Sequence, residues 1–292
     1  MTETGMTGRA LVLSGGGVTG IAWGVGLLAG LARAGLDLGH ADLTVGTSAG
    51  SVVGSQVAGG VAPETLLAAQ LAPSQERAAS FDPAEMARMF QALVQEVGPD
   101  PRALRRRIGA LALTASAVPE RERVDIVASR LVNRSWPERR LLIVAVDVAS
   151  GEERVFDRDS GVPLVEAVAA SCAVPGVWPP VTIGEHRYMD GGVRSTTNAD
   201  LAAGCGRVLV LSLMGLDASP TLGREVEALR QAGAAVQVVG PDDASLEAIG
   251  PNVLDPARRA VTAQAGLAQG ERLVGALRAF WEAGEVGASP LR

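Results

Sequence analysis

The stretch DLTVGTSAGSVV, residues 42–53, determines how the rest of the chain is interpreted. Its apolar start predicts a strand, and the small residues that follow Gly50 predict a helix. Between them lies G-x-S-x-G, a motif that places Ser48 on a sharp, strained turn at a helix N-terminus. Gly46 and Gly50 lack a Cβ, so the strand and helix backbones can approach closely there. We interpret Ser48 as a nucleophile rather than part of a chance pentapeptide in a glycine-rich chain.

The composition narrows the class of protein. The 292 residues are 47% hydrophobic and 20% charged, as in ordinary soluble globular proteins, and the formal net charge of -6 argues against nucleic-acid binding. Two cysteines, Cys172 and Cys205, do not make a disulfide framework. Residues 1–9 lack the apolar run of a signal peptide, and we find no transmembrane segment. We therefore expect a cytoplasmic location.

A glycine-rich loop precedes the serine motif. Residues 10–13 read as a buried strand, residues 14–20 are SGGGVTG, and residues 21–36 read as an apolar helix. This layout aims backbone N–H groups at an anion. One interpretation is an oxyanion hole formed by the N–H groups of Gly15, Gly16 and Gly17.

The same loop allows two other interpretations. Gly15-x-Gly17-x-x-Gly20 matches the dinucleotide fingerprint, for which Asp37 or Asp42 could supply the required acid. The loop could also be no more than a tight turn between a strand and a helix. The second strand-turn-helix unit, which carries a serine, favours the oxyanion hole.

A carboxylate follows a later strand. Residues 186–189 read as a short strand, and Asp190, Gly191 and Gly192 come directly after it. A serine nucleophile needs a base, yet His40 lies at the far end of the strand that delivers Ser48. His186 is four residues from Asp190 along a strand, and no histidine follows Asp190. By exclusion, Asp190 is the base, provided that it lies in a partly dry site beside the serine.

The middle of the chain, residues 61–134, reads as helices with few strand signals. Asp82-Pro83 predicts a helix start, and the expected helices cover residues 82–97, 101–111 and 120–132. Two features have alternative interpretations. The stripe of Met86, Met89 and Phe90 predicts core packing or a lipid-facing cap. The triplet of residues 105–107, all arginine, predicts a solvated face or a site for phosphate head groups.

The remainder alternates strands with helices. Strands are expected at residues 141–148, 154–156, 181–183, 207–213 and 235–239, and helices at 163–173, 222–231 and 256–281. This alternation predicts one α/β domain with a mainly parallel sheet. Residues 170–180, with three prolines, read as a rigid wall of a pocket. Residues 240–243, GPDD, indicate a capped turn more strongly than a metal site.

Three motifs in this order resemble the patatin-like phospholipases: GGGVTG at 15–20, GTSAG at 46–50 and DGG at 190–192. The segment 170–180 resembles the family's segment upstream of the aspartate. The likeness spans about residues 9–200. It implies a three-layer α/β/α fold in a single domain over residues 1–292, with a helical insertion at about 61–134 and a C-terminal α/β and helical extension at 205–292.

The resemblance also implies a chemistry. Ser48 would be the nucleophile and Asp190 the general base of a Ser-Asp dyad that needs no metal and no cofactor. The substrates would be fatty-acyl esters of phospholipids, lysophospholipids or related lipids, met at a membrane surface and cleaved through an acyl-enzyme. One departure is Thr19, which stands where the family usually has a basic residue. The absence of that positive charge makes a neutral or single-chain ester more plausible as a substrate.

Three other functions compete with lipid hydrolysis. The first is acyl transfer to an acceptor other than water through the same acyl-enzyme. The second is a nucleotide-binding oxidoreductase built on the glycine loop. The third is a non-catalytic lipid-binding module, for which Ser48 would be dispensable.

Overall fold

A mixed eight-stranded sheet forms the centre of the computed structural model, which describes residues 7–73, 79, 83–114 and 118–283. The neighbours β3, β2, β1, β7 and β8 run parallel, whereas β4 and β6 pair antiparallel with β3, and β5 pairs antiparallel with β6. The expected mainly parallel sheet is confirmed. The strands are β1 Arg9–Leu13, β2 Leu43–Thr47, β3 Arg140–Asp147, β4 Glu153–Phe156, β5 Val181–Ile183, β6 His186–Asp190, β7 Arg207–Leu211 and β8 Ala235–Val239.

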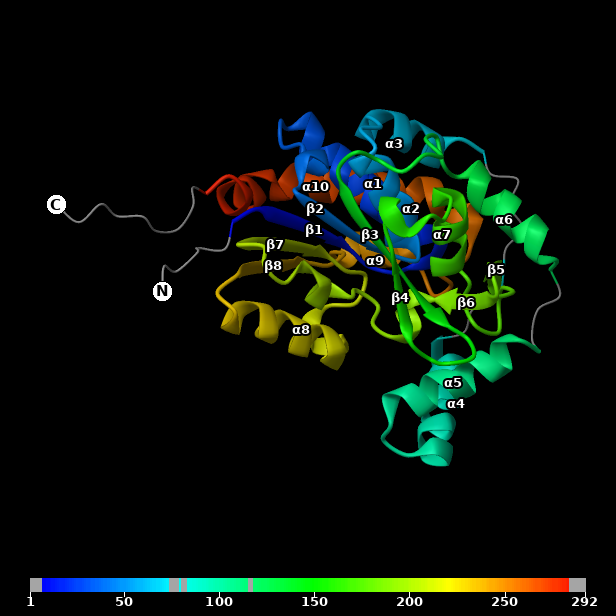
Figure 1. The fold of residues 1–292 in the computed structure, drawn as a ribbon. Helices are drawn as coiled ribbons and strands as arrows, with labels where there is room; N and C mark the ends of the chain where they lie inside the picture. The colour runs from blue at the N-terminus through cyan, green and yellow to red at the C-terminus, as the bar shows by residue number, and fades with distance from the viewer. Residues whose placement is uncertain (1–6, 74–78, 80–82, 115–117, 284–292) are drawn as a thin grey trace.

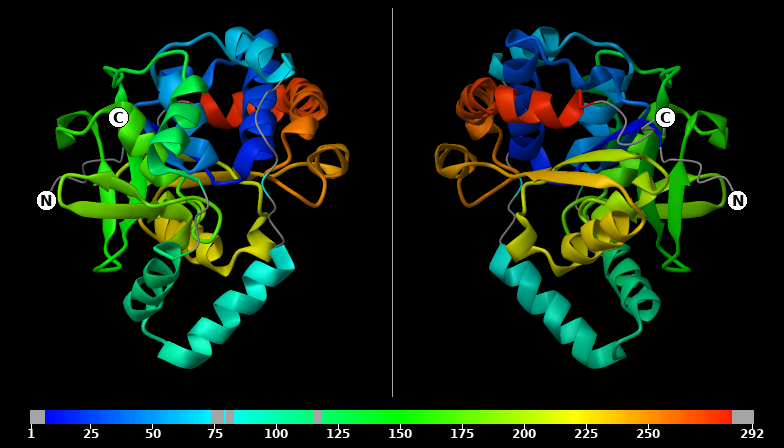
Figure 2. Two further views of the ribbon diagram at one scale, coloured as in Figure 1. Left: turned by 90° about the vertical axis from the view of Figure 1, so that its right-hand side faces the viewer. Right: turned by 90° about the vertical axis from the view of Figure 1, so that its left-hand side faces the viewer.

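Helices cover both faces of this sheet (Figures 1 and 2). The helices α1, α2, α3, α7 and α10 lie on one face and α8 on the other, which makes the predicted three-layer α/β/α fold. No helix of the described ranges is long and apolar enough to cross a membrane. The helices are α1 Gly17–Arg33, α2 Ala49–Ala58, α3 Pro63–Leu71, α4 Pro83–Val97, α5 Pro101–Ala112, α6 Glu120–Ser129, α7 Leu164–Ser171, α8 Pro220–Gln231, α9 Asp243–Ile249 and α10 Arg259–Trp281.

The side chains of β1 point alternately to the two helical layers. Leu11 and Leu13 belong to the large apolar cluster that contains the buried residues of α1, α2, α7 and α10, whereas Ala10 and Val12 belong to the cluster with α8. Successive side chains of a strand point to opposite faces, so a strand that is apolar throughout is buried between two helical layers. Residues 10–13 therefore anchor the sheet in the middle of the molecule.

The helices α1 and α10 pack closely because both have glycines at their contact. A Cβ added to Gly26 would lie 2.1 Å from the carbonyl oxygen of Ala263, and one added to Gly270 would lie 2.3 Å from that of Leu27. Neither distance can accommodate a real side chain. The C-terminal helix is thus held directly against the helix that follows the glycine loop.

The helices α4 and α5 project from the body as a pair (Figures 1 and 2). Met89 and Phe90 are half-buried against a small cluster with Leu93 and Ile108 of the same pair, as expected of core packing. The lipid-facing cap stays a prediction. Asp82 and the side chain of Met86 lie outside the described residues.

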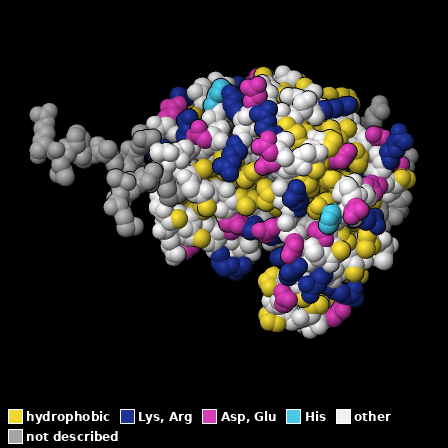
Figure 3. Space-filling model, viewed as in Figure 1, with side chains coloured by type: hydrophobic (Ala, Val, Ile, Leu, Met, Phe, Trp, Pro, Cys, Tyr) yellow, Lys and Arg dark blue, Asp and Glu magenta, His cyan; other side chains and the backbone are white. Residues whose placement is uncertain are grey.

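The arginine triplet lies on α5. Arg105 donates to the carbonyl oxygen of Gly151 at 2.6 Å, and Arg107 forms a 2.8 Å ion pair with Glu96. Over the face drawn in Figure 3, basic and acidic side chains are interspersed, including on these two helices. Two of the three arginines are therefore used within the protein itself, as expected of a partly solvated face.

Several element boundaries differ from the sequence expectation. Helix α1 begins at Gly17 rather than residue 21, because the last glycines of the loop already form its first turn. Helix α6 ends at Ser129, three residues early, and the long C-terminal helix begins at Arg259 after a short 3-10 turn at residues 256–258. The helix α3 lies in the stretch 61–134 that reads as helical, although no bounds were expected for it, and α9 was not expected from the sequence.

Candidate active site

The strands β2 and β6 meet end to end on one edge of β3. Residues 143 and 144 of β3 pair with β4 on one side and with Gly46 and Thr47 of β2 on the other. Residues 145 and 146 pair again with β4, so Met189 and Asp190 of β6 must occupy the same edge as β2. The carboxyl ends of β2 and β6 therefore face each other, and this register brings Ser48 next to Asp190.

Ser48 lies on a strained turn between β2 and α2. Its φ is 51° and its ψ is -117°, in a region that is costly for a residue with a side chain. The backbones lie so close at this turn that a Cβ on Gly50 would be only 1.9 Å from the carbonyl oxygen of Leu13. The Ser48 N–H donates to the Ser171 hydroxyl at 2.9 Å, which ties the turn to the end of α7.

Asp190 is buried at the end of β6. Its Oδ1 accepts the Gly192 N–H at 2.7 Å, while the buried Oδ2 accepts no hydrogen bond of normal geometry from the described residues. Burial raises the pKa of Asp190 to about 6. The Ser48 hydroxyl lies close enough to oppose that rise, as do the Gly192 N–H and the charge of Arg123. Desolvation thus outweighs the groups that favour the carboxylate.

The backbone around Asp190 is fixed from several sides. The Asp190 N–H donates to the carbonyl oxygen of Ala173 at 2.9 Å. A Cβ on Gly191 would lie 2.3 Å from the carbonyl oxygen of Val144, so this position accommodates only glycine. The side chain of Asn198 donates to Thr47 Oγ1 at 2.9 Å, which connects the loop after Asp190 to the end of β2.

The glycine loop lies at the same edge. The Gly15 N–H donates to the carbonyl oxygen of Thr196 at 2.8 Å, whereas the N–H groups of Gly16 and Gly17 have no backbone acceptor in the described ranges outside the helices and strands. Gly17 has φ 63°, and a Cβ there would lie 2.6 Å from the carbonyl oxygen of Val253. Of the three candidate donors, Gly15 is thus already engaged.

The other motif glycines support these turns. A Cβ on Gly46 would lie 2.6 Å from the carbonyl oxygen of Gly50, which fits a close contact of strand and helix. The Gly20 N–H donates to the Gly16 carbonyl oxygen at 2.8 Å, and a Cβ on Gly20 would lie 3.5 Å from that of Ala49. Gly192 supplies the N–H that Asp190 accepts. The loop, the serine turn and the aspartate turn therefore form one connected unit.

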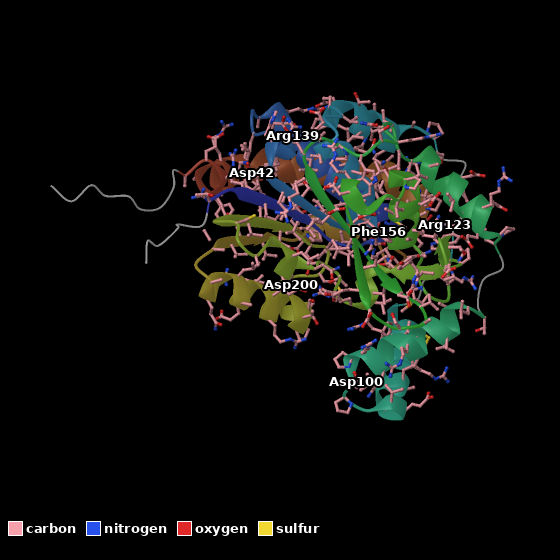
Figure 4. All side chains as sticks on the ribbon, in the orientation of Figure 1. Asp42, Asp100, Arg123, Arg139, Phe156 and Asp200 are labelled. Carbon is pink, nitrogen blue, oxygen red and sulfur yellow. The ribbon has the colours of Figure 1, made fainter. Side chains whose placement is uncertain are left out.

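Both histidines lie away from this unit. His40 precedes β2 and forms a 2.8 Å contact with the guanidinium of Arg139, which Figure 4 shows with Asp42 on the side of the molecule opposite Arg123. His186 begins β6, at the end opposite Asp190, and its Nδ1 lies 2.9 Å from Asp147 Oδ2. Neither imidazole is placed to contact Ser48.

Ser48 lines a small cavity that continues into a larger one. The small cavity, of about 20 Å³, includes Cys172, Val174 and Trp178, so the segment 170–180 does wall a pocket. The larger cavity, of about 700 Å³, shares six residues with it, namely Val18, Ile21, Arg123, Arg130, Trp178 and Leu254. Its volume is in the range of ligand pockets in proteins.

The individual contacts of three residues at the site were not expected from the sequence. Ser171 accepts the Ser48 N–H, and Trp178 stacks on Arg123, whose Cζ lies 3.9 Å from the ring centroid. Arg123 is only 3% exposed although it carries a charge. The segment 170–180 was expected to wall a pocket, but nothing in the pattern of residues 120–132 indicated that one arginine of α6 would be buried beside it.

The turn at residues 240–243 has a structural role. Asp242 caps α9 by accepting the Ser245 N–H at 2.9 Å, and it forms an ion pair with Arg272. No group of three or more metal-ligating acids, cysteines or histidines occurs within the described residues. The capped turn predicted for this segment is therefore what the fold contains.

Comparison with known proteins gives a family and a set of similar structures. The sequence model of the patatin-like phospholipase family matches residues 11–203. VipD from Legionella pneumophila is similar at 12% identity and a TM-score of 0.44 over 92% of this chain and 67% of its own. The type III effector ExoU is similar at 17% identity and a TM-score of 0.38 over 91% of this chain and 53% of its own.

A second ExoU structure, in complex with SpcU from the type III secretion system of Pseudomonas aeruginosa, is similar at 15% identity and a TM-score of 0.34, over 92% of this chain and 53% of its own. The chain thus spans about half the length of the ExoU chains. No curated protein matches the sequence.

Proposed function

The chain belongs to the patatin-like phospholipase family, whose members are lipid acyl hydrolases, and we propose that it cleaves fatty-acyl esters through an acyl-enzyme on Ser48. The substrates are phospholipids, lysophospholipids or related lipids. Asp190 is the general base, and the N–H groups of Gly16 and Gly17 are the oxyanion donors. Gly15 holds the loop through its bond to Thr196 rather than acting as a donor.

The proposed reaction begins at the serine hydroxyl. As Ser48 Oγ attacks the ester carbonyl carbon, its proton passes to Asp190 Oδ2, the carboxyl oxygen that accepts no other hydrogen bond of normal geometry from the described residues. Negative charge develops on the carbonyl oxygen and is stabilised by the N–H donors at the start of α1. The tetrahedral intermediate collapses, the alcohol leaves with the proton from Asp190, and the acyl group stays on Ser48.

Deacylation repeats these steps with water. Asp190 takes a proton from the attacking water, and the second tetrahedral intermediate releases the fatty acid with return of the proton to Ser48 Oγ. A base must hold the proton only briefly, so its pKa should lie near the working pH. The pKa of Asp190, raised by burial to about 6, suits that role better than an exposed aspartate would.

One observation carries the proposal: β2 and β6 end against each other on the same edge of β3, so that a strained serine meets a buried carboxylate. Both residues are also held by separate contacts, Ser48 through Ser171 and Asp190 through Gly192 and Ala173. Preorganised groups of this kind are what an acyl-transfer site requires.

Covalent labelling tests the nucleophile. We expect a fluorophosphonate to add once to the wild-type protein, and intact-mass measurement should find no adduct on Ser48→Ala. Ser135→Ala, which removes an exposed serine far along the chain, is the matched control and should label normally. Folded wild-type protein without an adduct would refute the proposal.

The base is tested by turnover of a lipid-ester panel. Asp190→Asn should lose hydrolysis by at least about 1000-fold, as expected when an essential base is removed. His40→Ala and His186→Ala should retain it, because both imidazoles lie at the far ends of their strands. Loss of activity in a folded histidine variant would show that the dyad is assigned incorrectly.

A further inference from the structure

Two residues other than glycine have a positive φ in the described part of the chain: Ser48, at 51°, and Asn198, at 50°. This left-handed conformation is costly for residues with a side chain, although asparagine tolerates it better than most. Residues held in it gather at functional sites, where the surrounding contacts enforce the conformation. Asn198 is fully buried on the loop after Asp190. Its conformation therefore directs attention to what its side chain does there.

The Asn198 amide contacts both sides of the proposed dyad. Its Nδ2 donates to the side-chain oxygen of Thr47, the residue before the nucleophile, at 2.9 Å. The same nitrogen donates to the carbonyl oxygen of Ser195 at 2.7 Å and lies 3.5 Å from that of Gly191, the residue after the base. One side chain thus connects the backbone that carries the nucleophile to the backbone that carries the base.

Arg194 sets the direction of this amide. Its guanidinium donates to Asn198 Oδ1 at 2.7 Å. Because a guanidinium has only donors, the amide turns its oxygen toward Arg194 and its nitrogen toward the three oxygens on the other side. Arg194 is itself held by an ion pair with Glu153 of β4 and by one of 2.6 Å with Asp200, which Figure 4 shows beside α8.

The loop that carries the amide is anchored at two further points. The carbonyl oxygen of Thr196 accepts the Gly15 N–H at 2.8 Å, which connects the loop to the glycine loop. The Thr197 hydroxyl donates at 2.6 Å to the buried carboxylate of Glu225 on α8. The loop therefore contacts the glycine loop, the end of β2 and the aspartate turn, and the amide lies where these meet.

We propose that Asn198 is a positioning residue of the dyad, whose amide holds Ser48 Oγ and Asp190 Oδ2 in the alignment that proton transfer requires. It lines neither of the two cavities beside the serine and acts through Thr47 and Gly191. Proton transfer needs a contact of hydrogen-bond length, so a small displacement of either strand end slows the chemical step more than it weakens substrate binding. The proposal rests on the hydrolase function proposed above.

Two substitutions remove the connecting bond from opposite ends. Asn198→Gly removes the amide, and glycine readily adopts the positive φ of this position. Thr47→Val removes the hydroxyl that accepts from the amide, whereas Thr47→Ser keeps it. Thr44→Val is the matched control, because it makes the same change on β2 where the side chain faces Gly54 of α2, on the other side of the sheet.

The readouts are kcat and KM for p-nitrophenyl octanoate and the second-order rate of fluorophosphonate labelling. We expect kcat to fall about 100-fold in Asn198→Gly and at least about tenfold in Thr47→Val, with labelling slowed in parallel and KM changed less than about twofold. Thr47→Ser and Thr44→Val should keep the wild-type kcat within about threefold. Urea unfolding of each variant measures how much stability the substitution costs.

The outcomes separate this proposal from the one on which it rests. Wild-type kcat in both Asn198→Gly and Thr47→Val would overturn the positioning role and leave the hydrolase intact. An equal loss of kcat in Thr44→Val and Thr47→Val would also overturn it, because the loss would then follow from any buried hydroxyl of the strand. If Asn198→Gly does not fold, the comparison of Thr47→Val with Thr47→Ser decides. Wild-type protein with neither turnover nor an adduct would overturn the hydrolase itself, and the positioning role with it.

Discussion

Burial of the Asp190 carboxyl has a structural cost. A carboxyl at the end of β6 is 5% exposed, and the fold gives its Oδ1 only the Gly192 N–H at 2.7 Å. The unfolded chain would leave the same carboxyl hydrated, with an ordinary pKa near 3.9. Water would stabilise the charged carboxylate better than the fold does, and the raised pKa suits the general-base role that we propose for Asp190.

The first prediction at this scale concerns the pH profile. The proposed reaction needs Asp190 as a carboxylate, so we expect kcat/KM to rise with pH and to level off above an apparent pKa of about 6. A serine activated by histidine would instead follow the pKa of an imidazole and would lose its activity with that histidine. Measuring kcat/KM from pH 4.5 to 8.5 in the wild type and His186→Ala checks this, and the two profiles should coincide.

The second prediction concerns stability. Because burial raises the pKa of Asp190, the folded state binds the proton more tightly than the unfolded state. Stability is therefore full below pH about 4 and falls as the pH rises through about 6. Asp190→Asn stays neutral throughout and should be more stable than the wild type at pH 7.5, by about 3 kcal/mol at most, since one pKa unit corresponds to about 1.4 kcal/mol.

Urea unfolding at two pH values measures this difference. The gain in unfolding free energy should be present at pH 7.5 and absent at pH 4, where the wild-type carboxyl is protonated. An equal gain at both pH values would mean that the substitution improves packing and that the charge is not the cause.

At the scale of elements, the contact of α1 with α10 depends on glycines. A Cβ on Gly30 would lie 2.2 Å from the carbonyl oxygen of Leu267, so Gly30→Ala must push the two helices apart. We expect it to lower the unfolding free energy by about 3 kcal/mol, in the upper range for overpacked contacts. Thermal unfolding followed by circular dichroism measures the change.

Gly275 provides the matched control, because it belongs to α10, the helix that contacts α1, but lies away from their contact. It lies within α10, and nothing lies within 4 Å of a Cβ added there. Gly275→Ala should raise stability by about 0.5–1 kcal/mol, because alanine loses less backbone freedom than glycine when a helix forms. If both substitutions have the same effect, close packing is not what determines the requirement for glycine.

The elements also show what the sequence could predict. The motif around Ser48 and the strands at residues 181–183 and 235–239 were predicted because each has a local pattern of apolar and turn residues. The bounds of α3 were not predicted within the helical stretch 61–134, because its sequence, PETLLAAQL, has no continuous apolar stripe. The end of α6 was misplaced because its apolar residues continue to Leu131, past the last hydrogen-bonded turn.

The site was predictable in part for the same reason. Ser48, Asp190 and the glycine loop belong to motifs that are local in sequence, whereas their proximity depends on the register of β2 and β6 against β3. The N–H of Gly15 was expected in an oxyanion hole, and its bond to Thr196 connects residues that are far apart in the chain. Arg123 and Trp178 are likewise brought together only by the tertiary fold.

At the scale of the molecule, the sheet extends beyond the part of the chain that the family model matches. The strands β7 and β8 pair in parallel beside β1, and α10 covers α1, although all three lie after residue 203. The carbonyl oxygen of Val253 also accepts the Thr19 N–H at 3.0 Å, next to the glycine loop. We propose that the C-terminal residues form one domain with the rest.

A truncated chain tests whether the C-terminal residues belong to the same domain as the rest. A protein that ends at Gly206 would expose Leu11, Leu13 and the apolar face of α1, which β7 and α10 cover in the full chain. We expect it to lack a cooperative unfolding transition in urea and to show no fluorophosphonate adduct. A truncated protein that unfolds cooperatively and labels at Ser48 would mean that residues 207–283 are a separable addition.

The bond between Thr19 and Val253 has a consequence for biosynthesis. A ribosome delivers the chain from the N-terminus, so the glycine loop emerges early and its support emerges more than two hundred residues later. Until then the loop has neither Val253 nor α10 against it, and the nascent protein has a serine without a completed site. The glycine loop can therefore reach the supported conformation seen in the fold only after Val253 and α10 have been synthesised.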